Sequence, residues 1–190
     1  PIDMSNRVSI REAVVSVEEQ LGTITTLVNN AGMPDAQWAV KQSDELIDTV
    51  MGTNLTGPYI LSCEVARKLM QEKLPGRMVN IASMAAFNTT SQSAAPLYSI
   101  TKKALVRMTE ALAVEWAGRN INVNAIAPGF FSSEMTDGML ERVGDITPTL
   151  NRKRIPTAEQ MDSTLLFLLS PSSECVTGTC IKIDDGQMSR

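Results

Sequence analysis

The chain of 190 residues, of which 43% are hydrophobic and 20% are charged, is long enough to form one globular domain with a sizeable core. Its net charge of −4, with lysines and arginines scattered along the sequence, argues against a nucleic-acid or anionic-membrane partner. Because the sequence contains no histidine, it excludes a Ser-His-Asp triad and a histidine-ligated zinc site. Proton transfer near neutral pH must therefore use Lys, Tyr, Cys or a carboxylate with a shifted pKa.

The first half of the chain alternates helical and strand patterns. A helix is predicted at 6–21, and its apolar face carries Ile10, Val14, Val17 and Leu21. The β-rich run "TTLVNNAG" predicts a strand at 25–30. A long helix follows at 44–73, bent near Pro58, and "GRMVNIAS" predicts a strand that ends at Ser83.

The second half continues the alternation. A helix is predicted at 96–118, followed by the strand "INVNAIAPG". The segment 130–156 has two equally weighted interpretations: a mobile helical excursion that covers a ligand, or a surface loop with a few buried anchors. The capping box Thr157-x-x-Gln160 opens a last helix, and "CIKIDDG" predicts a last strand. Strands alternating with helices of this length predict one α/β domain over 1–190 with a parallel sheet.

Three cysteines, Cys63, Cys175 and Cys180, show no metal-ligand spacing, and their odd number argues against a disulfide framework. We therefore expect packing or loop thiols in a reducing, cytoplasmic compartment, and no metal site. The first residue is Pro1 rather than Met, which predicts a processed chain or a fragment.

Small and polar residues follow the predicted strands, where a parallel sheet binds ligands. They are Asn29-Asn30-Ala31-Gly32, Ser83 and Pro128-Gly129. The next helix presents Tyr98 and Lys102 one turn apart on one face. A nearby ammonium lowers the pKa of a phenol from about 10 by one to three units, which would make Tyr98 a usable proton carrier. Taken alone, Tyr-x-x-x-Lys is more often a chance surface pair.

Five motifs occur in one order: Asn-Asn-Ala-Gly after a strand, "TNLTG" in a helix, a strand ending in Ser, Tyr-x-x-x-Lys and "APGF". Together they closely resemble the classical short-chain dehydrogenase/reductase family, and the similarity runs essentially from Ile2 to the C-terminus. The resemblance implies a Rossmann-like parallel sheet with helices on both faces. It also implies a catalytic tetrad of Asn54, Ser83, Tyr98 and Lys102.

The resemblance assigns a role to each residue of this tetrad. Tyr98 is the general acid/base, and Ser83 orients the substrate oxygen. Lys102 lowers the pKa of Tyr98 and binds the nicotinamide ribose. Asn54 anchors a water that relays protons to Lys102; the alternative is a polar residue at a helix kink.

The resemblance also implies an NAD or NADP site. The positions that match the family's cofactor-binding residues are Asp3, Met4, Asn30, Ala31, Gly32, Tyr98, Lys102, Gly129, Phe131 and Ser133. Asp3-Met4 would contact adenine, and Gly129–Ser133 would grip the carboxamide. Asp185 departs from the family's Asp-Gly-Gly pattern at the C-terminal turn. The spacing from Ser83 to Tyr98 is slightly long, so we expect a bulge between them.

The family's glycine-rich pyrophosphate loop has no counterpart in the sequence, so we expect a chain that lacks the first two βα units. The strand expected at 1–4 would then have no neighbour, and the strand at 25–30 would form an open edge. A truncated record of a longer enzyme explains this best, and we expect the chain alone to be marginally stable, aggregation-prone and weak in dinucleotide binding.

The expected function is NAD(P)-dependent interconversion of a carbonyl and a secondary alcohol by hydride transfer. The segment "APGFFSSEMT" resembles both 3-oxoacyl carrier-protein reductases and sugar-acid dehydrogenases. A dimer or tetramer through the helices at 44–73 and 96–118 is implied by the same family. The alternative is a non-catalytic α/β scaffold or interaction protein with a relic active site. A third alternative, an α/β hydrolase, is disfavoured because the sequence has no Gly-x-Ser-x-Gly elbow.

Overall fold

The computed structural model describes residues 1–89 and 95–187. Its apolar runs form a four-stranded parallel sheet in the order β1-β2-β3-β4. The strands are β1 (Thr26–Asn29), β2 (Gly76–Ile81), β3 (Ile121–Pro128) and β4 (Cys180–Ile183). Both Met78 and Val79 are buried although they point to opposite faces, as expected for a central strand covered on both sides.

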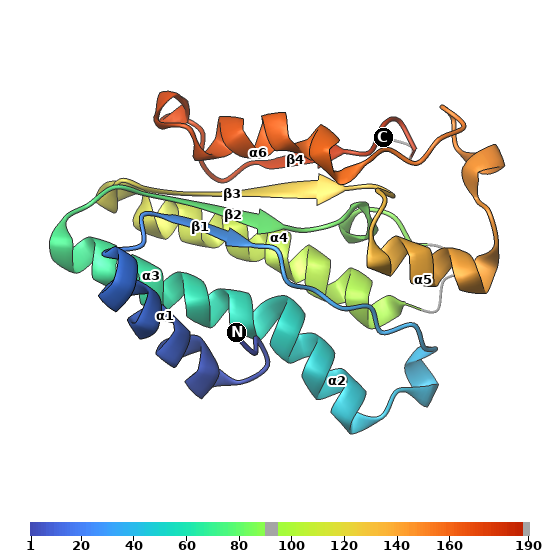
Figure 1. The fold of residues 1–190 in the computed structure, drawn as a ribbon, viewed down its shortest axis with the longest axis horizontal. Helices are drawn as coiled ribbons and strands as arrows, with labels where there is room; N and C mark the ends of the chain where they lie inside the picture. The colour runs from blue at the N-terminus through green and yellow to red at the C-terminus, as the bar shows by residue number, and fades with distance from the viewer. Residues whose placement is uncertain (90–94, 188–190) are drawn as a thin grey trace.

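Helices cover both faces of this sheet (Figure 1). They are α1 (Arg7–Leu21), α2 (Asp44–Met51), α3 (Gly57–Glu72), α4 (Pro96–Trp116), α5 (Glu134–Val143) and α6 (Asp162–Leu169). On one face, α3 and α4 pack on Met78 and Val123, and α1 packs on α3. On the other face, Leu168 of α6 packs on Val79 and Ile126. The predicted α/β class with helices on both faces is confirmed.

The helix predicted at 6–21 is confirmed as α1, whose first backbone N–H groups are capped by the Asn6 side chain. Its predicted apolar face is only partly buried, since Ile10 and Val14 are covered but Val17 and Leu21 are 39% and 83% exposed. Periodicity shows which residues share a face, whereas burial depends on what lies over that face.

The helix predicted at 44–73 is divided by a π-helical turn at Gly52–Thr56. The irregularity therefore lies before Pro58, not at it. Pro58 occupies the first turn of α3, where its missing N–H costs no hydrogen bond. Gly57 is required at this junction because an added Cβ would lie 2.2 Å from the Met4 carbonyl oxygen.

The N-terminal segment differs from the prediction. Residues 1–4 form no strand, and Met4 is buried beside the start of α3 instead. In the described sheet β1 has β2 as its neighbour, so β1 forms the predicted edge. The bulge expected between Ser83 and Tyr98 involves residues 90–94, which lie outside the described residues.

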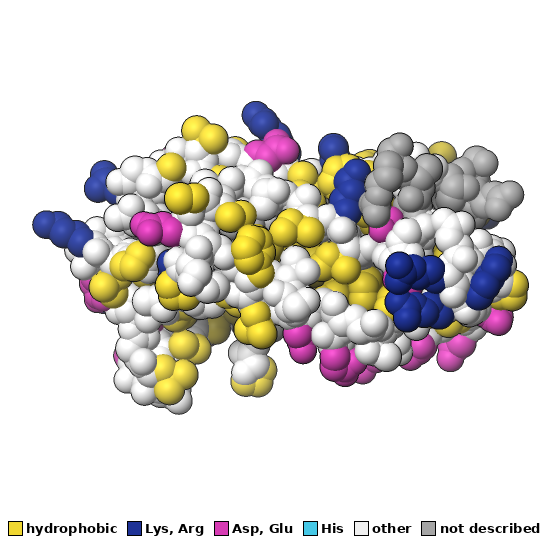
Figure 2. Space-filling view, turned by 90° about the horizontal axis from the view of Figure 1, so that it is seen from above, with side chains coloured by type: hydrophobic (Ala, Val, Ile, Leu, Met, Phe, Trp, Pro, Cys, Tyr) yellow, Lys and Arg dark blue, Asp and Glu magenta, His cyan; other side chains and the backbone are white. Residues whose placement is uncertain are grey.

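The segment 130–156 is a helical excursion at the carboxyl end of the sheet (Figure 1). It contains α5 and a short 3-10 turn at Thr147–Thr149, and it is anchored by buried Phe131 and Leu150. Hydrophobic side chains are spread over the face on the α6 side, and Lys and Arg side chains gather near the end that carries this segment (Figure 2). None of the helices in residues 1–89 and 95–187 is long and apolar enough to cross a membrane.

Candidate active site

The carboxyl ends of β1, β2 and β3 meet at one edge of the sheet. The residues predicted to follow them, Asn30–Gly32, Ser83 and Gly129, lie at this edge because the three strands run parallel and in register. Helix α4 crosses below the same edge and contributes Tyr98 and Lys102 from its first two turns. The fold therefore assembles segments that are far apart in the sequence.

A chain of buried side chains fixes α4 against the sheet. The Asn29 amide donates to the Asn80 side-chain oxygen at 2.8 Å, and the Asn80 amide donates to the Thr109 hydroxyl at 2.9 Å. All three residues are at most 4% exposed, so these polar groups depend on one another for hydrogen bonds. They join β1, β2 and α4 into one rigid support for the edge where Tyr98 lies.

The Ser83 hydroxyl lies near enough to Tyr98 to act on its hydroxyl group. Ser83 ends the β2 run, and its Oγ also accepts from the Ala85 N–H at 3.1 Å. Ser99, beside Tyr98, donates to the Ala85 carbonyl oxygen at 2.6 Å, which ties the first turn of α4 to the turn after β2. Burial raises the pKa of Tyr98, and the interaction with Ser83 opposes that rise.

Lys102 is 3% exposed, and its Nζ donates to the Ile81 carbonyl oxygen at 2.7 Å. The amine lies 5.6 Å from the centre of the Tyr98 ring. Burial lowers the pKa of Lys102 to about 8, because the charged form loses its hydration.

The structure does not show the predicted lowering of the pKa of Tyr98 by Lys102. The pKa of Tyr98 is raised from its ordinary value, and the partner that opposes this rise is Ser83 rather than Lys102. The physical reason is burial, which penalises the charge of both side chains: it raises the pKa of the phenol and lowers that of the amine. Proximity of the two groups was correctly predicted; the direction of the phenol's pKa shift was not.

Asn54 lies on the π-helical turn and is fully buried. Its amide accepts from the Met33 N–H and donates to the Met33 carbonyl oxygen, both at 2.9 Å, and it donates to the Thr101 hydroxyl at 3.2 Å. Asn54 therefore joins the loop after β1 to α4. Its role in a proton relay stays a prediction.

The side chains of Asn54 and Lys102 both lie next to the backbone of Gly32. A Cβ added at Gly32 would lie 3.2 Å from the Lys102 Nζ and 3.6 Å from the Asn54 Oδ1. The absence of a side chain keeps this approach open beside the exposed residues Asn30 and Ala31. An open backbone next to a buried amine fits the ribose side of a nicotinamide nucleotide.

The C-terminal turn holds the predicted carboxamide segment. The Gln187 side chain accepts from the Phe130 N–H at 2.6 Å and donates to the Phe130 carbonyl oxygen at 2.9 Å. Gly129 lies so close that an added Cβ would be 2.3 Å from the Gln187 Oε1. Phe131 is 6% exposed, and the Ser133 hydroxyl accepts from the Thr136 N–H at the start of α5. No local pattern in the sequence indicated the Gln187 contact.

Asp185, which departs from the family pattern, adopts a left-handed backbone conformation with φ of 51°. Its carboxylate accepts from Arg152 at 2.9 Å and from Arg154 at 2.7 and 2.9 Å. These pairs tie the C-terminal turn to the end of the segment 130–156. Asp185 stands where the family pattern has a glycine, and its side chain anchors the segment 130–156.

Asp3 and Met4 lie before α1. The Asp3 carboxylate accepts from the backbone N–H and the hydroxyl of Ser5, and Asp3 is exposed. The described residues hold no cluster of three or more His, Cys, Asp or Glu that could bind a metal ion. Burial raises the pKa of Cys180 to about 11, which fits a packing role.

Sequence reasoning missed Asp35, which is 4% exposed on the loop after β1. Its carboxylate accepts hydrogen bonds from the backbone N–H groups of Leu97 and Tyr98. One indirect signal existed: α4 begins with Pro96 after Ala95, whose side chain cannot cap a helix.

Comparisons with known proteins find relatives over nearly the whole chain. A family model described as enoyl-(acyl carrier protein) reductase matches residues 1–188. The chain is 32% identical over 191 residues to 2-dehydro-3-deoxy-D-gluconate 5-dehydrogenase of Dickeya dadantii. It is 33% identical over 187 residues to 3-oxoacyl-[acyl-carrier-protein] reductase of Thermotoga maritima. These alignments cover 99% and 97% of this chain and 74% of each relative.

Solved structures share the fold. A short-chain type dehydrogenase/reductase from Mycobacterium marinum superposes with a TM-score of 0.93 at 27% identity, over 100% of this chain and 74% of that one. A 4-hydroxyisoleucine dehydrogenase complexed with NADH superposes with a TM-score of 0.85 at 28% identity, over 98% of this chain and 79% of that one. Actinorhodin polyketide ketoreductase with NADPH gives 0.91 at 28% identity, over 98% and 76%.

Proposed function

The chain belongs to the classical short-chain dehydrogenase/reductase family and is therefore an NAD(P)-dependent oxidoreductase, and we propose that it interconverts a carbonyl and a secondary alcohol with Tyr98 as general acid/base. The observation that carries this proposal is the buried amine of Lys102, 5.6 Å from the centre of the Tyr98 ring, with the Ser83 hydroxyl close enough to oppose the rise that burial causes in the pKa of Tyr98. The alternative of a non-catalytic scaffold is not favoured, because the relatives are dehydrogenases and reductases.

The proposed roles follow from where each group lies. In the reductive direction the Tyr98 hydroxyl donates a proton to the substrate oxygen as the carbonyl carbon gains a hydride, and in the oxidative direction Tyr98 accepts that proton. Ser83 donates a hydrogen bond to the same oxygen, where negative charge develops. A bound NAD(P) supplies the hydride donor or acceptor. Because its pKa is raised, Tyr98 keeps its proton at neutral pH, which suits donation in the reductive direction, whereas the oxidative direction requires its phenolate form.

Lys102, Gly32, Gly129, Phe131 and Ser133 are the residues that would hold the nicotinamide half of the cofactor. The Lys102 amine and the open backbone at Gly32 would bind the ribose. The segment Gly129–Ser133, clamped by Gln187, would bind the carboxamide. Asn30 and Ala31 would line the ribose side, and Asp3 and Met4 the adenine side.

The substrate is proposed to be a 3-oxoacyl compound or a keto sugar acid, the two classes acted on by relatives. The segment 130–156 is proposed as the substrate lid. Phe131 is buried, and Met135 and Met139 are half-buried. This apolar content favours the acyl class.

A substrate panel tests the proposed function. NADH and NADPH oxidation would be followed with 3-oxoacyl thioesters and with keto sugar acids, for the protein and for Ser83→Ala. We expect turnover with one class, and a loss of about 10²- to 10³-fold in kcat for Ser83→Ala, because a donor to the developing oxyanion is removed. Equal rates for both proteins would contradict the assignment of Ser83, and no turnover on the whole panel would contradict these substrate classes.

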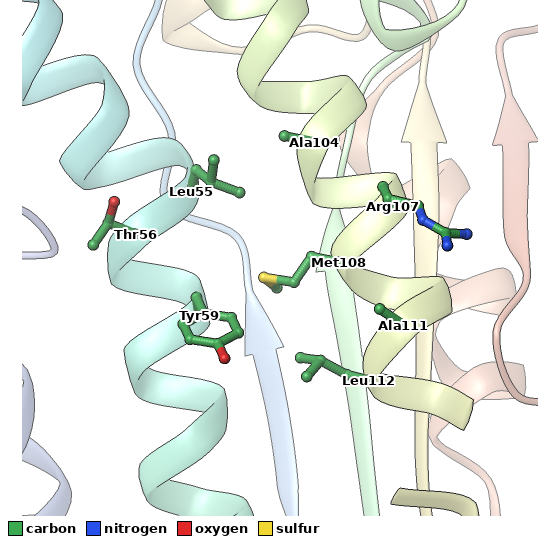
Figure 3. Close-up of a pocket in the computed structure, with 8 residues that line it drawn as sticks. All are labelled: Leu55, Thr56, Tyr59, Ala104, Arg107, Met108, Ala111 and Leu112. Atoms are coloured by element: carbon green, nitrogen blue, oxygen red, sulfur yellow. The ribbon is translucent and has the colours of Figure 1, made fainter. Parts of the chain in front are cut away.

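We further propose that the protein forms a dimer or tetramer through α3 and α4. A shallow apolar groove of about 430 Å³ lies between these helices, lined by Leu55, Tyr59, Met108 and Leu112 among others (Figure 3). Tyr59 is 49% exposed, and Val114 on α4 is 82% exposed. Pairing such helices across a two-fold axis would bury this apolar surface.

Sedimentation of Tyr59→Glu tests the proposed interface. A carboxylate placed in the groove would be buried without a partner in the oligomer, so we expect the variant to sediment as a smaller species. Leu166→Glu, on α6 at the opposite face of the sheet and 66% exposed, is the matched control and should sediment like the unchanged protein. Identical behaviour of both variants would reject α3 and α4 as the interface.

A cytoplasmic location stays an expectation, consistent with the free thiols.

A further inference from the structure

We propose that Asp35 is a positioning residue for Tyr98, because its carboxylate caps the N-terminus of the helix that carries the proposed general acid/base. This inference rests on the proposed function. Asp35 belongs to the loop after β1, and sixty residues of sequence separate it from the helix that it caps.

Within the described residues, the N-cap residue of α4 makes no side-chain hydrogen bond to the backbone N–H groups of the first turn. This N-cap residue is Ala95, and Pro96, which follows it, has no N–H. The Asp35 Oδ2 accepts from the Leu97 N–H at 2.9 Å, and the Asp35 Oδ1 accepts from the Tyr98 N–H at 3.3 Å. A carboxylate at this end also interacts favourably with the helix dipole. Asp35 thus does from a distance what an N-cap residue ordinarily does from the adjacent position.

Asp35 is itself held in place. The Gln42 side-chain amide donates to the Asp35 Oδ2 at 2.5 Å and to the Gln37 carbonyl oxygen at 3.2 Å. The next residue, Ala36, has a φ of 38°, a left-handed conformation that an alanine adopts only where its surroundings impose it. Asn54 holds the same loop through both backbone polar groups of Met33. The loop is therefore a built support rather than a free connection.

The position of Tyr98 makes it sensitive to this cap. Tyr98 is the third residue of α4 and lies in the turn that frays first when a helix loses its cap, whereas Lys102 lies one turn further in. The Tyr98 hydroxyl must stay within hydrogen-bond reach of the Ser83 hydroxyl and of the substrate oxygen. Loss of the Asp35 carboxylate is therefore expected to affect proton transfer more than cofactor binding.

Steady-state kinetics and cofactor binding test the proposal. Asp35→Ala should lower kcat at least tenfold, while the Kd for NADH or NADPH, measured by fluorescence, stays within twofold. Asp35→Asn, which keeps one acceptor oxygen, should recover most of the lost kcat. Asn6→Ala is the matched control, because the Asn6 side chain caps the Val8 and Ser9 N–H groups of α1 and has no proposed role in catalysis or cofactor binding. It should lower the thermal midpoint as Asp35→Ala does and leave kcat unchanged.

A second readout needs no turnover. The chain contains only two tyrosines, Tyr59 and Tyr98, so fluorotyrosine labelling gives two ¹⁹F resonances that Tyr98→Phe assigns. Asp35→Ala should shift or broaden the Tyr98 resonance and leave that of Tyr59 in place, and Asn6→Ala should change neither. This result would hold even if the substrate proposal failed.

Two outcomes would overturn the proposal: kcat unchanged in Asp35→Ala at a temperature where it is folded, or an unchanged Tyr98 resonance. If Asp35→Ala does not fold, Gln42→Ala replaces it, since it removes the donor that orients the carboxylate. Gln42→Ala should lower kcat at least threefold and shift the same resonance, and an unaltered kcat and resonance in that variant would overturn the proposal equally.

Discussion

Tyr98→Phe is expected to lower kcat by about 10²- to 10⁴-fold, the range that a positioned general acid contributes. The substitution removes the hydroxyl that lies near Ser83 and keeps the ring, so the packing of the first turn of α4 should survive. The Kd for NADH or NADPH should change little. Stopped-flow measurement of the hydride-transfer step would separate this loss of chemistry from any effect on cofactor release.

The control for this variant is Tyr59→Phe, which removes the hydroxyl of the other tyrosine in the chain, on α3. It should retain the full rate of turnover. If Tyr98→Phe instead turned over at a comparable rate, Tyr98 could not be the proton donor, and another protonated group at the carboxyl edge of the sheet would have to be sought.

Lys102→Met is expected to raise the free energy of unfolding and lower activity at the same time. Burial lowers the pKa of Lys102 from 10.5 to about 8, so the folded protein bears the cost of a buried charge at neutral pH. At about 1.4 kcal/mol per pKa unit this cost is about 3 kcal/mol, and loss of the bond to the Ile81 carbonyl oxygen offsets about 1 kcal/mol of the gain. We expect a net gain of about 2 kcal/mol at pH 7.

The sign of the pH dependence follows from the same shift. Between pH 8 and pH 10.5 the unfolded chain binds more protons at Lys102 than the folded chain does, so the free energy of unfolding rises with pH in this window. The advantage of Lys102→Met should therefore be largest below pH 8 and shrink as the pH approaches 10.5. Denaturant unfolding at pH 7 and at pH 10 measures this, and an advantage independent of pH would contradict it.

The activity of Lys102→Met should fall at least tenfold, because the variant lacks the amine proposed to hold the ribose. The pH profile of kcat/KM for the unchanged protein should show a group with a pKa of about 8, with activity in carbonyl reduction falling as Lys102 loses its proton. That inflection should be absent from Lys102→Met. Persistence of the inflection in the variant would assign it to another residue.

Most of the fold could be predicted from local sequence patterns. The continuous apolar runs of β2 and β3 predicted buried strands. The capping box Thr157–Gln160 has both reciprocal hydrogen bonds, but it opens a 3-10 turn at Ala158–Met161 that leads into α6 rather than α6 itself. Exposure of Val17 and Leu21 could not be predicted, because it depends on what packs over α1 rather than on the spacing within it.

Some residues of the site could likewise be predicted from the sequence, and others could not. The resemblance to the family implied the tetrad Asn54, Ser83, Tyr98 and Lys102, and in the structure the Lys102 amine lies near both Tyr98 and Asn54. Asp35 and Gln187 were missed, because their contacts join residues 62 and 57 positions apart and leave no periodic trace. The direction of the pKa shift of Tyr98 was also missed, since it depends on burial, which no spacing reports.

The π-helical turn at Gly52–Thr56 sets the rotational phase between α2 and α3. Each residue of a regular α-helix advances the side-chain direction by about 100°, so a one-residue deletion that restored a continuous helix would turn everything beyond it by that angle. Asn54 would then face away from Met33 and Thr101, its present partners. Insertions and deletions in this turn should therefore be tolerated less well than substitutions. A homologue aligned with a gap there would present a different side chain at the place that Asn54 occupies.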